Sequence, residues 1–271
     1  MEIFELEFMR RALLAALLVG VAAPSIGVFL VQRRLALLGD GIGHVAFMGV
    51  AAGLFLGTSP VVTGIVAASL AGAVLEVLRE KGRLAGDVAL ALIFYGGIAG
   101  GALLTFLSDK PNSVLGYLFG SVLTVTGQDL WILGVAGTVV LLSVTVLRKE
   151  LFAACYDDEV ARACGLPVRR LNFFMALAAA LTVGVTMRVV GVLLVSAMLV
   201  LPVAIVQQLA GSFRATVRAS LAVGGILSVG GVAAAFYLDT SPGATIVLLA
   251  IGVFALTALA ARQRTGGLAG G

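Results

Sequence analysis

The sequence predicts an all-α protein, a polytopic membrane helix bundle with about eight or nine transmembrane helices. Hydrophobic residues make up 61% of the chain, charged residues only 12%, and the mean hydropathy is +1.14. Soluble domains are about half apolar and about a quarter charged. The apolar residues gather in runs of about 20, the length that a helix needs to cross a bilayer. The 271 residues are therefore expected to form a single transmembrane domain over residues 1–271, with no soluble catalytic or nucleotide-binding domain.

Nine apolar stretches are candidate spans. In chain order they cover residues 12–31, 35–57, 60–78, 88–107, 129–147, 171–187, 190–209, 216–237 and 243–261. The first stretch is longer than the apolar core of a typical signal peptide, so we expect it to remain as a span. The region from 171 to 209 is ambiguous, because Arg188 and Gly191 mark either a turn between two spans or a break in one bent unit.

Two further segments are not expected to span. Residues 113–128 are apolar but short and interrupted by glycine, which predicts a re-entrant or surface helix. Residues 148–170 form the longest polar segment. Within it, Asp157 or Asp158 is expected to cap a short helix that ends near Gly165. This segment is either a solvated connector or a docking helix that transmits a push from a cytosolic partner to both neighbouring spans.

The positions of Lys and Arg predict the orientation of the chain. If the first span runs from the outside to the cytoplasm, only Arg10, Arg11, Lys110 and Arg188 of the 18 basic residues lie outside. Cytoplasmic loops carry an excess of basic residues. The N-terminus is therefore predicted to be extracytoplasmic, and residues 148–170 cytoplasmic. This distribution accounts for the net charge of +4, so the expected surroundings are a lipid bilayer, and no nucleic-acid partner is expected.

Asp40 and His44 are the candidate metal-binding residues. They lie four residues apart in an apolar stretch, and His44 is the only histidine. On a helix this spacing places both side chains on one face, where a carboxylate oxygen and an imidazole nitrogen can reach one cation. A charged Asp within a span costs about 2.5 to 3.5 kcal/mol, so Asp40 is expected to have a partner or a function. The alternative is that Asp40 caps a helix beginning at Gly41 while His44 packs in the bundle.

One copy of the chain offers too few ligands for a complete metal site. Zinc prefers about four ligands, and the chain has no second histidine. Two copies related by a two-fold axis supply two aspartates and two histidines, a set that suits Zn²⁺ and is acceptable to Mn²⁺ or Fe²⁺. The residues therefore predict a homodimer with a pathway for a divalent metal ion.

Five segments, in this order, resemble the membrane permease subunits of bacterial ABC importers for zinc, manganese and iron(II). They read LGDGIGHVAFMGVAAG, GYLFGSVLTVTGQDL, DDEVARACGLPVRRLN, LTVGVTMRVVGVLLVSAMLVLPVA and DTSPGATIVLLA. The resemblance extends from about Arg33 to the last span. It implies a type II-like ABC importer permease that works as a homodimer by alternating access.

The resemblance also implies partners and a location. Each copy would bind a cytosolic ABC ATPase subunit through about residues 157–168, and an extracytoplasmic metal-binding protein would deliver the ion. The chain itself would be no enzyme, would bind no tight cofactor, and would lie in the bacterial plasma membrane. The family's metal residues match Asp40 and His44, whereas Gly43 stands where a serine is common. The segment GVTMRVVGVLLVSA resembles zinc members more than manganese members, so Zn²⁺ is the expected cargo, ahead of Mn²⁺ or Fe²⁺.

Three other function classes fit the residues less well. A stand-alone, proton-coupled metal carrier or channel could use Asp40 and His44 as a proton relay. An aspartyl intramembrane protease needs two aspartates within the membrane, and the second candidate, Asp157, lies in the polar segment. A serine intramembrane protease needs a nucleophile, and the sequence has no Gly-x-Ser-x-Gly motif beside its histidine.

Overall fold

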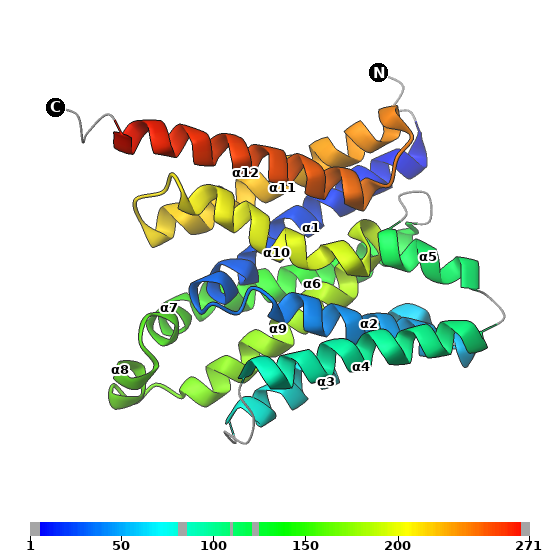
Figure 1. Cartoon of the computed structure of the whole chain (residues 1–271), viewed down its shortest axis with the longest axis horizontal. Helices are drawn as coiled ribbons and strands as arrows, with labels where there is room; N and C mark the ends of the chain where they lie inside the picture. Colours follow the sequence, from blue (N-terminus) through cyan, green and yellow to red (C-terminus); the bar gives the residue numbers. More distant parts are fainter. Residues whose placement is uncertain (1–5, 81–85, 109–110, 121–124, 267–271) are drawn as a thin grey trace.

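The computed structural model describes residues 6–80, 86–108, 111–120 and 125–266, and every regular element within them is an α-helix (Figure 1). The helices are α1 (Glu7–Gln32), α2 (Leu38–Phe55), α3 (Pro60–Glu80), α4 (Gly86–Leu107), α5 (Pro111–Phe119), α6 (Gly127–Val146), α7 (Arg148–Tyr156), α8 (Asp158–Ala163), α9 (Val168–Val190), α10 (Val192–Gln207), α11 (Phe213–Leu238) and α12 (Pro242–Gly266). The predicted all-α membrane bundle is confirmed.

Eight of the described helices are long and apolar enough to cross a bilayer, namely α1, α2, α3, α4, α6, α9, α11 and α12. Each coincides with one of the predicted spans, with ends that differ by a few residues. The ninth predicted span corresponds to α10, which has 16 residues and is shorter than the others. The α10 helix nevertheless packs against α1, α2, α11 and α12, so it is an integral part of the bundle.

The junction of α9 and α10 is a true turn between two helices. The α9 helix runs away from α8, and α10 returns toward that end of the molecule (Figure 1). Gly191 forms the turn with φ 91° and ψ 146°, a conformation that is essentially restricted to glycine. A Cβ atom at this position would lie only 2.4 Å from the carbonyl oxygen of Leu118 in α5. Backbone conformation and close packing therefore both require a glycine here.

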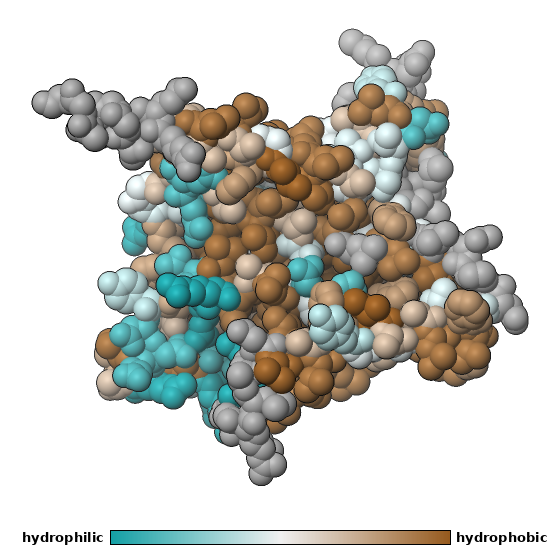
Figure 2. Space-filling model, in the orientation of Figure 1, coloured by the Kyte–Doolittle hydropathy of each residue, from teal (hydrophilic) through white to brown (hydrophobic). Residues whose placement is uncertain are grey.

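The centre of the bundle is formed by α1 and α9, which are the most buried of the candidate spans, whereas α4 and α12 are the least buried. The α2 helix packs between α3, α4 and α10. Figure 2 shows a largely hydrophobic surface over α12, α10, α2 and α4, with the hydrophilic surface gathered at the end that carries α7 and α8. This pattern is the one expected for a bundle whose side wall contacts lipid and whose one end contacts water.

The α5 helix corresponds to the predicted re-entrant or surface segment. Its nine residues are too few to cross a bilayer. It packs against α2, α9 and α10 at the end of the bundle opposite α8 (Figure 1). Residues 121–124, the next part of that predicted segment, lie outside the described residues. The helix therefore packs against one end of the bundle and does not span it.

The polar segment contains two helices, α7 and α8, where the sequence predicted one. Asp157 is the N-cap of α8, and its Oδ1 atom accepts hydrogen bonds from the backbone N–H groups of Glu159 (2.9 Å) and Val160 (3.0 Å). Gly165, with φ 81°, follows the helix in the left-handed conformation that commonly ends helices. The predicted cap and stop are thus present, with Asp157 rather than Asp158 in the capping role.

Candidate functional site

Asp40 and His44 both lie in the first half of α2. The helix begins at Leu38, and its N-cap residue Leu37 makes no side-chain capping bond. Asp40 is therefore inside the helix, and the alternative in which it caps a helix beginning at Gly41 is wrong. The spacing of four residues places His44 one turn farther along the same face, about 6 Å along the helix axis.

The carboxylate of Asp40 has a hydrogen-bond partner on another helix. The hydroxyl of Ser196 in α10 donates to Oδ1 of Asp40, and the Ser196 residue is buried. This bond joins α2 to α10 across 156 positions of the sequence. Sequence reasoning missed Ser196, although it is the only hydroxyl residue in the apolar run of α10. The bond holds the carboxylate in one orientation, which is what a binding site for a cation needs.

Gly43 lies where α2 packs closely against α10. In the family that the sequence resembles, a serine is common at this position of α2. A Cβ atom at Gly43 would lie 3.3 Å from the carbonyl oxygen of Val192, so this face of α2 packs closely against the backbone of α10. The hydroxyl that reaches Asp40 belongs to Ser196, one helical turn beyond Val192.

The His44 ring is held by an aromatic contact with α4. It packs edge-on against the ring of Phe94, with centroids 4.3 Å apart and planes at 86°. The backbone of α4 also approaches closely, since a Cβ atom at Gly97 would lie 2.6 Å from the carbonyl carbon of His44. Within the described part of the chain, neither ring nitrogen has a hydrogen-bond partner. The imidazole is thus oriented by packing, and its nitrogen atoms are free to bind a ligand.

The described residues of one chain do not complete a metal site with strong ligands. The described residues contain no group of three or more His, Cys, Asp and Glu side chains that could hold a metal ion. Both cysteines, Cys155 and Cys164, are free thiols at the α7–α8 end. Burial raises the pKa of Cys155 to about 11, so this thiol stays protonated and inert near neutral pH. The donors that converge on the α2 face are a carboxylate, an imidazole and a hydroxyl.

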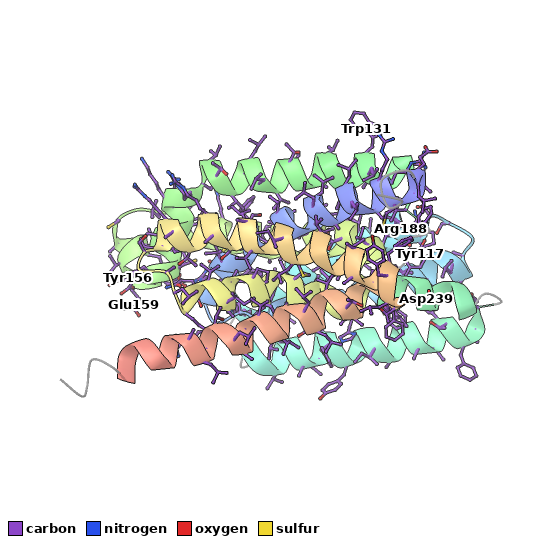
Figure 3. The ribbon with its side chains drawn as sticks, turned by 90° about the horizontal axis from the view of Figure 1, so that it is seen from above. Tyr117, Trp131, Tyr156, Glu159, Arg188 and Asp239 are labelled. Carbon is purple, nitrogen blue, oxygen red and sulfur yellow. The ribbon has the colours of Figure 1, made fainter. Side chains whose placement is uncertain are left out.

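A second polar cluster lies at the opposite end of the bundle from α8 (Figure 3). Arg188 of α9 forms an ion pair with Asp129 of α6, and its guanidinium lies 5.7 Å from the ring centroid of Tyr117 in α5. Asp129 also completes a capping box with Thr126 at the start of α6. The sequence predicted Arg188 as a residue outside the membrane that marks a turn or a break in the chain, without a partner for its charge. The structure gives it a role in joining α5, α6 and α9.

The predicted partner-binding segment, residues 157–168, comprises α8 and the turn that follows it. Beside it lies an open groove of about 790 Å³. The groove is lined by Arg33, Glu76, Arg79, Asp158, Arg162, Leu166, Pro167, Val168, Arg169 and Asn172. Figure 3 places Tyr156 and Glu159 at this end, far from Arg188, Tyr117 and Asp239. The segment is therefore presented at the hydrophilic end of the molecule.

Comparison with known proteins identifies the family. The family described as the ABC 3 transport family matches residues 5–261 of the chain. The chain belongs to this family. As a member, it is the membrane permease subunit of a metal ABC importer and is not itself an enzyme. Membership confirms the resemblance found in the sequence and does not favour the stand-alone carrier.

The permease is similar to several characterised proteins. It is 31% identical to the manganese transport system membrane protein MntC of Halalkalibacterium halodurans, over 94% of this chain and 88% of that protein. It is also 31% identical to the chelated iron transport system membrane protein YfeD of Yersinia pestis, over 92% of this chain and 84% of that protein. Among solved structures, PsaBC from Streptococcus pneumoniae in complex with Fab contains a chain with 28% identity and a TM-score of 0.85, covering 94% of the permease and 92% of that chain.

Proposed function

We propose that this permease moves a divalent first-row transition metal ion into the bacterial cytoplasm along a path that passes Asp40 and His44. The observation that carries the proposal is the arrangement on α2, where a carboxylate fixed by Ser196 and an imidazole fixed by Phe94 share one helix face within a candidate span. Ionisable residues inside a membrane span generally mark a pathway or a binding site.

The donor types limit the choice of metal. Carboxylate and hydroxyl oxygens suit Mn²⁺, and imidazole suits Fe²⁺ and Zn²⁺. Soft ions such as Cu(I) prefer thiolate, and both free cysteines lie in or beside α7 and α8 rather than on α2. Zn²⁺ stays the prediction from the sequence. The relatives named above are manganese and iron transport proteins, which makes Mn²⁺ and Fe²⁺ the competing candidates.

A second copy of the chain would complete the site. One copy offers two strong ligands, and a two-fold axis would bring two carboxylates and two imidazoles around one ion. In this homodimer the ligands of both copies would have to face the axis, so the α2 face between α4 and α10 would lie near it. The site would then open alternately to the two sides of the membrane as the copies move against each other.

The hydrophilic end of the bundle is proposed to face the cytoplasm. It carries α7 and α8 and most of the basic residues, as cytoplasmic ends do. There, residues 157–168 would dock an ABC ATPase subunit, and ATP-driven closure would press on α8. An extracytoplasmic metal-binding protein would deliver the ion to the opposite end, where α5 and the Arg188–Asp129 pair lie. The N-terminus would then be extracytoplasmic.

The experiment is ATP-dependent uptake of radioactive Zn²⁺ and Mn²⁺ into proteoliposomes that contain the permease, its ATPase and its binding protein. We expect Asp40→Asn and His44→Gln to lower uptake more than tenfold while the ATPase still co-purifies. The matched control is Asp239→Asn. Asp239 lies at the end of the bundle opposite α8, and asparagine tolerates its left-handed backbone (φ 51°). Near-normal uptake by both site variants would refute the proposed path.

Competition in the same vesicles decides the cargo. A tenfold excess of unlabelled Mn²⁺ that abolishes Zn²⁺ uptake would favour manganese over the zinc prediction. Vesicles that hold the permease without its ATPase should take up neither ion. Uptake by the permease alone would instead support a stand-alone carrier.

A further inference from the structure

Arg33 joins three helices at the α8 end of the molecule. It is the C-cap residue of α1, and its side chain is only 12% exposed. One guanidinium nitrogen forms an ion pair with Asp158 in the first turn of α8, and the other donates to Oδ1 of Asn172 in the first turns of α9. A largely buried charge with two charge-assisted hydrogen bonds holds its partners more firmly than an exposed surface pair does. We call these three residues the Arg33 clamp.

Hydrophobic contacts attach the neighbouring helix α7 to the same end of α1. The ring of Phe213 in α11 packs against Phe152 of α7 at 4.6 Å and against Phe29 of α1 at 5.6 Å between centroids. The thiol of Cys155 in α7 lies 3.7 Å from the carbonyl oxygen of Phe29. The α7–α8 segment is therefore packed on the last turn of α1, and the Arg33 clamp fixes its outer part.

The connection from Arg33 to α2 is short and is held by several backbone hydrogen bonds. Arg34, with φ 59°, ends α1 in a Schellman motif, because its N–H bonds to Val31 and the N–H of Leu35 bonds to Leu30. The N–H of Leu38 then bonds to Leu35, which starts α2 directly. A displacement of Arg33 is thus passed to the first turn of α2 without a flexible linker. That turn contains Asp40.

We propose that Arg33 is a positioning residue that transmits movement of α8 to the Asp40 end of α2. This inference rests on the proposed function, in which an ATPase presses on α8. When α8 is pushed, the Asp158–Arg33 pair moves the end of α1, and the Schellman turn rotates or shifts the start of α2. The hydroxyl of Ser196 on α10 binds the Asp40 carboxylate on α2. A shift of α2 relative to α10 therefore changes the geometry of this hydrogen bond and the position of the carboxylate in the site.

The test measures coupling in the assembled transporter with its ATPase and binding protein. Arg33→Gln removes the charge, and the double variant Arg33→Asp with Asp158→Arg restores an ion pair with the charges exchanged. Arg34→Asn is the matched control, because it removes the adjacent arginine and retains a residue that tolerates the left-handed conformation. We measure radioactive Zn²⁺ or Mn²⁺ taken up per ATP hydrolysed, together with co-purification of the ATPase.

We expect Arg33→Gln to bind the ATPase and hydrolyse ATP near the wild-type rate, but to transport at least fivefold less metal per ATP. The double variant should recover at least half of the lost coupling, and Arg34→Asn should resemble the wild type. If Arg33→Gln transports as much metal per ATP as the wild type, the inference is overturned. Loss of ATPase binding together with uptake would also overturn it, because Arg33 would then act only by shaping the docking surface.

A second readout does not depend on the cargo. Hydrogen exchange of residues 38–44 is compared between the resting transporter and the transporter trapped with ATP and vanadate. We expect trapping to change exchange in the wild type and not in Arg33→Gln, and equal changes in both would refute the clamp. A wild type that takes up neither metal would refute the proposed function, while the exchange comparison would still test the clamp. If Arg33→Gln does not fold, Asn172→Ala is used to break the clamp from α9. This variant should also transport less metal per ATP and should also lose the change in hydrogen exchange of residues 38–44.

Discussion

At the residue scale, the candidate site depends on contacts that bring a different helix to each functional side chain. Asp40 is held by Ser196 of α10, and His44 is held by Phe94 of α4. The two ligands share a face of α2, but their orientations are set by the neighbouring helices. Substitutions at those neighbours should therefore alter the affinity for metal while α2 itself is unchanged.

Replacing Ser196 with alanine should weaken metal binding. The change removes the hydrogen bond that orients Asp40, and a bond to a charged group contributes about 1.5 to 3 kcal/mol. We expect the KM for metal uptake to rise about tenfold, the equivalent of about 1.4 kcal/mol. The control is Ser220→Ala in α11, because the buried Ser220 hydroxyl has no hydrogen-bond partner within the described residues. Equal KM values for Ser196→Ala and the wild type would show that the bond does not position the carboxylate.

Uptake should fall as the pH is lowered. A metal ion binds only the neutral imidazole, and an ordinary histidine has a pKa of about 6.5. Protonation of the imidazole would remove one metal ligand, so a low metal concentration should be taken up more slowly at pH 5.5 than at pH 7.5. ATP hydrolysis measured in the same vesicles controls for the partner proteins. Constant uptake between these pH values, with active partners, would contradict a ligand role for His44.

At the element scale, the turn between α9 and α10 decides how the bundle is connected. Gly191 ends one helix and starts the next, and its neighbours include the carbonyl oxygen of Leu118 at the end of α5. Three elements therefore meet at one backbone position, at the same end of the bundle as the Arg188–Asp129 pair. A side chain at this point would disturb all three.

Gly191→Ala should destabilise the permease severely. The backbone conformation alone costs a non-glycine residue about 1 to 3 kcal/mol, and the added Cβ would lie 2.4 Å from the Leu118 oxygen. We expect Tm in detergent to fall by more than about 5 °C. Gly252→Ala in α12 is the control, because no atom lies within 4 Å of its added Cβ and alanine favours a helix. A Tm for Gly191→Ala equal to that of the control would refute this view of the turn.

The sequence predicts these helices well because hydropathy is a local property. All nine apolar stretches became helices with ends within a few residues of prediction. The α7 helix was missed because it has only nine residues and its first three are charged, so its short apolar part does not stand out from the polar segment around it. The contacts of Ser196 with Asp40 and of Arg188 with Asp129 were also missed, since they join positions 156 and 59 residues apart. Such contacts depend on how helices rotate against one another, which hydropathy does not determine.

At the whole-molecule scale, the two ends of the bundle differ in polarity. The α7–α8 end carries hydrophilic surface, whereas the side wall over α2, α4, α10 and α12 is largely hydrophobic (Figure 2). This asymmetry supports a fixed orientation in the membrane. It also offers a direct measurement, because the two cysteines of the chain lie at the hydrophilic end.

A membrane-impermeant maleimide should label Cys164 in inside-out vesicles and not in intact cells. The Cys164 side chain is exposed beside α8, which is proposed to face the cytoplasm. Cys155 serves as an internal control, because burial raises its pKa to about 11 and keeps its thiol unreactive near pH 7.5. Labelling is measured by mass spectrometry, with Cys164→Ser to confirm the assignment. Labelling of Cys164 in intact cells would contradict the proposed orientation and place the α7–α8 end outside the cytoplasm.

The close packing of Gly43 against the Val192 carbonyl limits how the metal preference of this permease can change. A side chain at position 43 would place its Cβ atom 3.3 Å from that carbonyl oxygen, so α10 would have to shift by a few tenths of an ångström to admit a new ligand there. The Ser196 side chain already reaches Asp40 from α10. A library aimed at altered metal selectivity should therefore vary position 196 and its neighbours on α10 and leave the glycine of α2 in place.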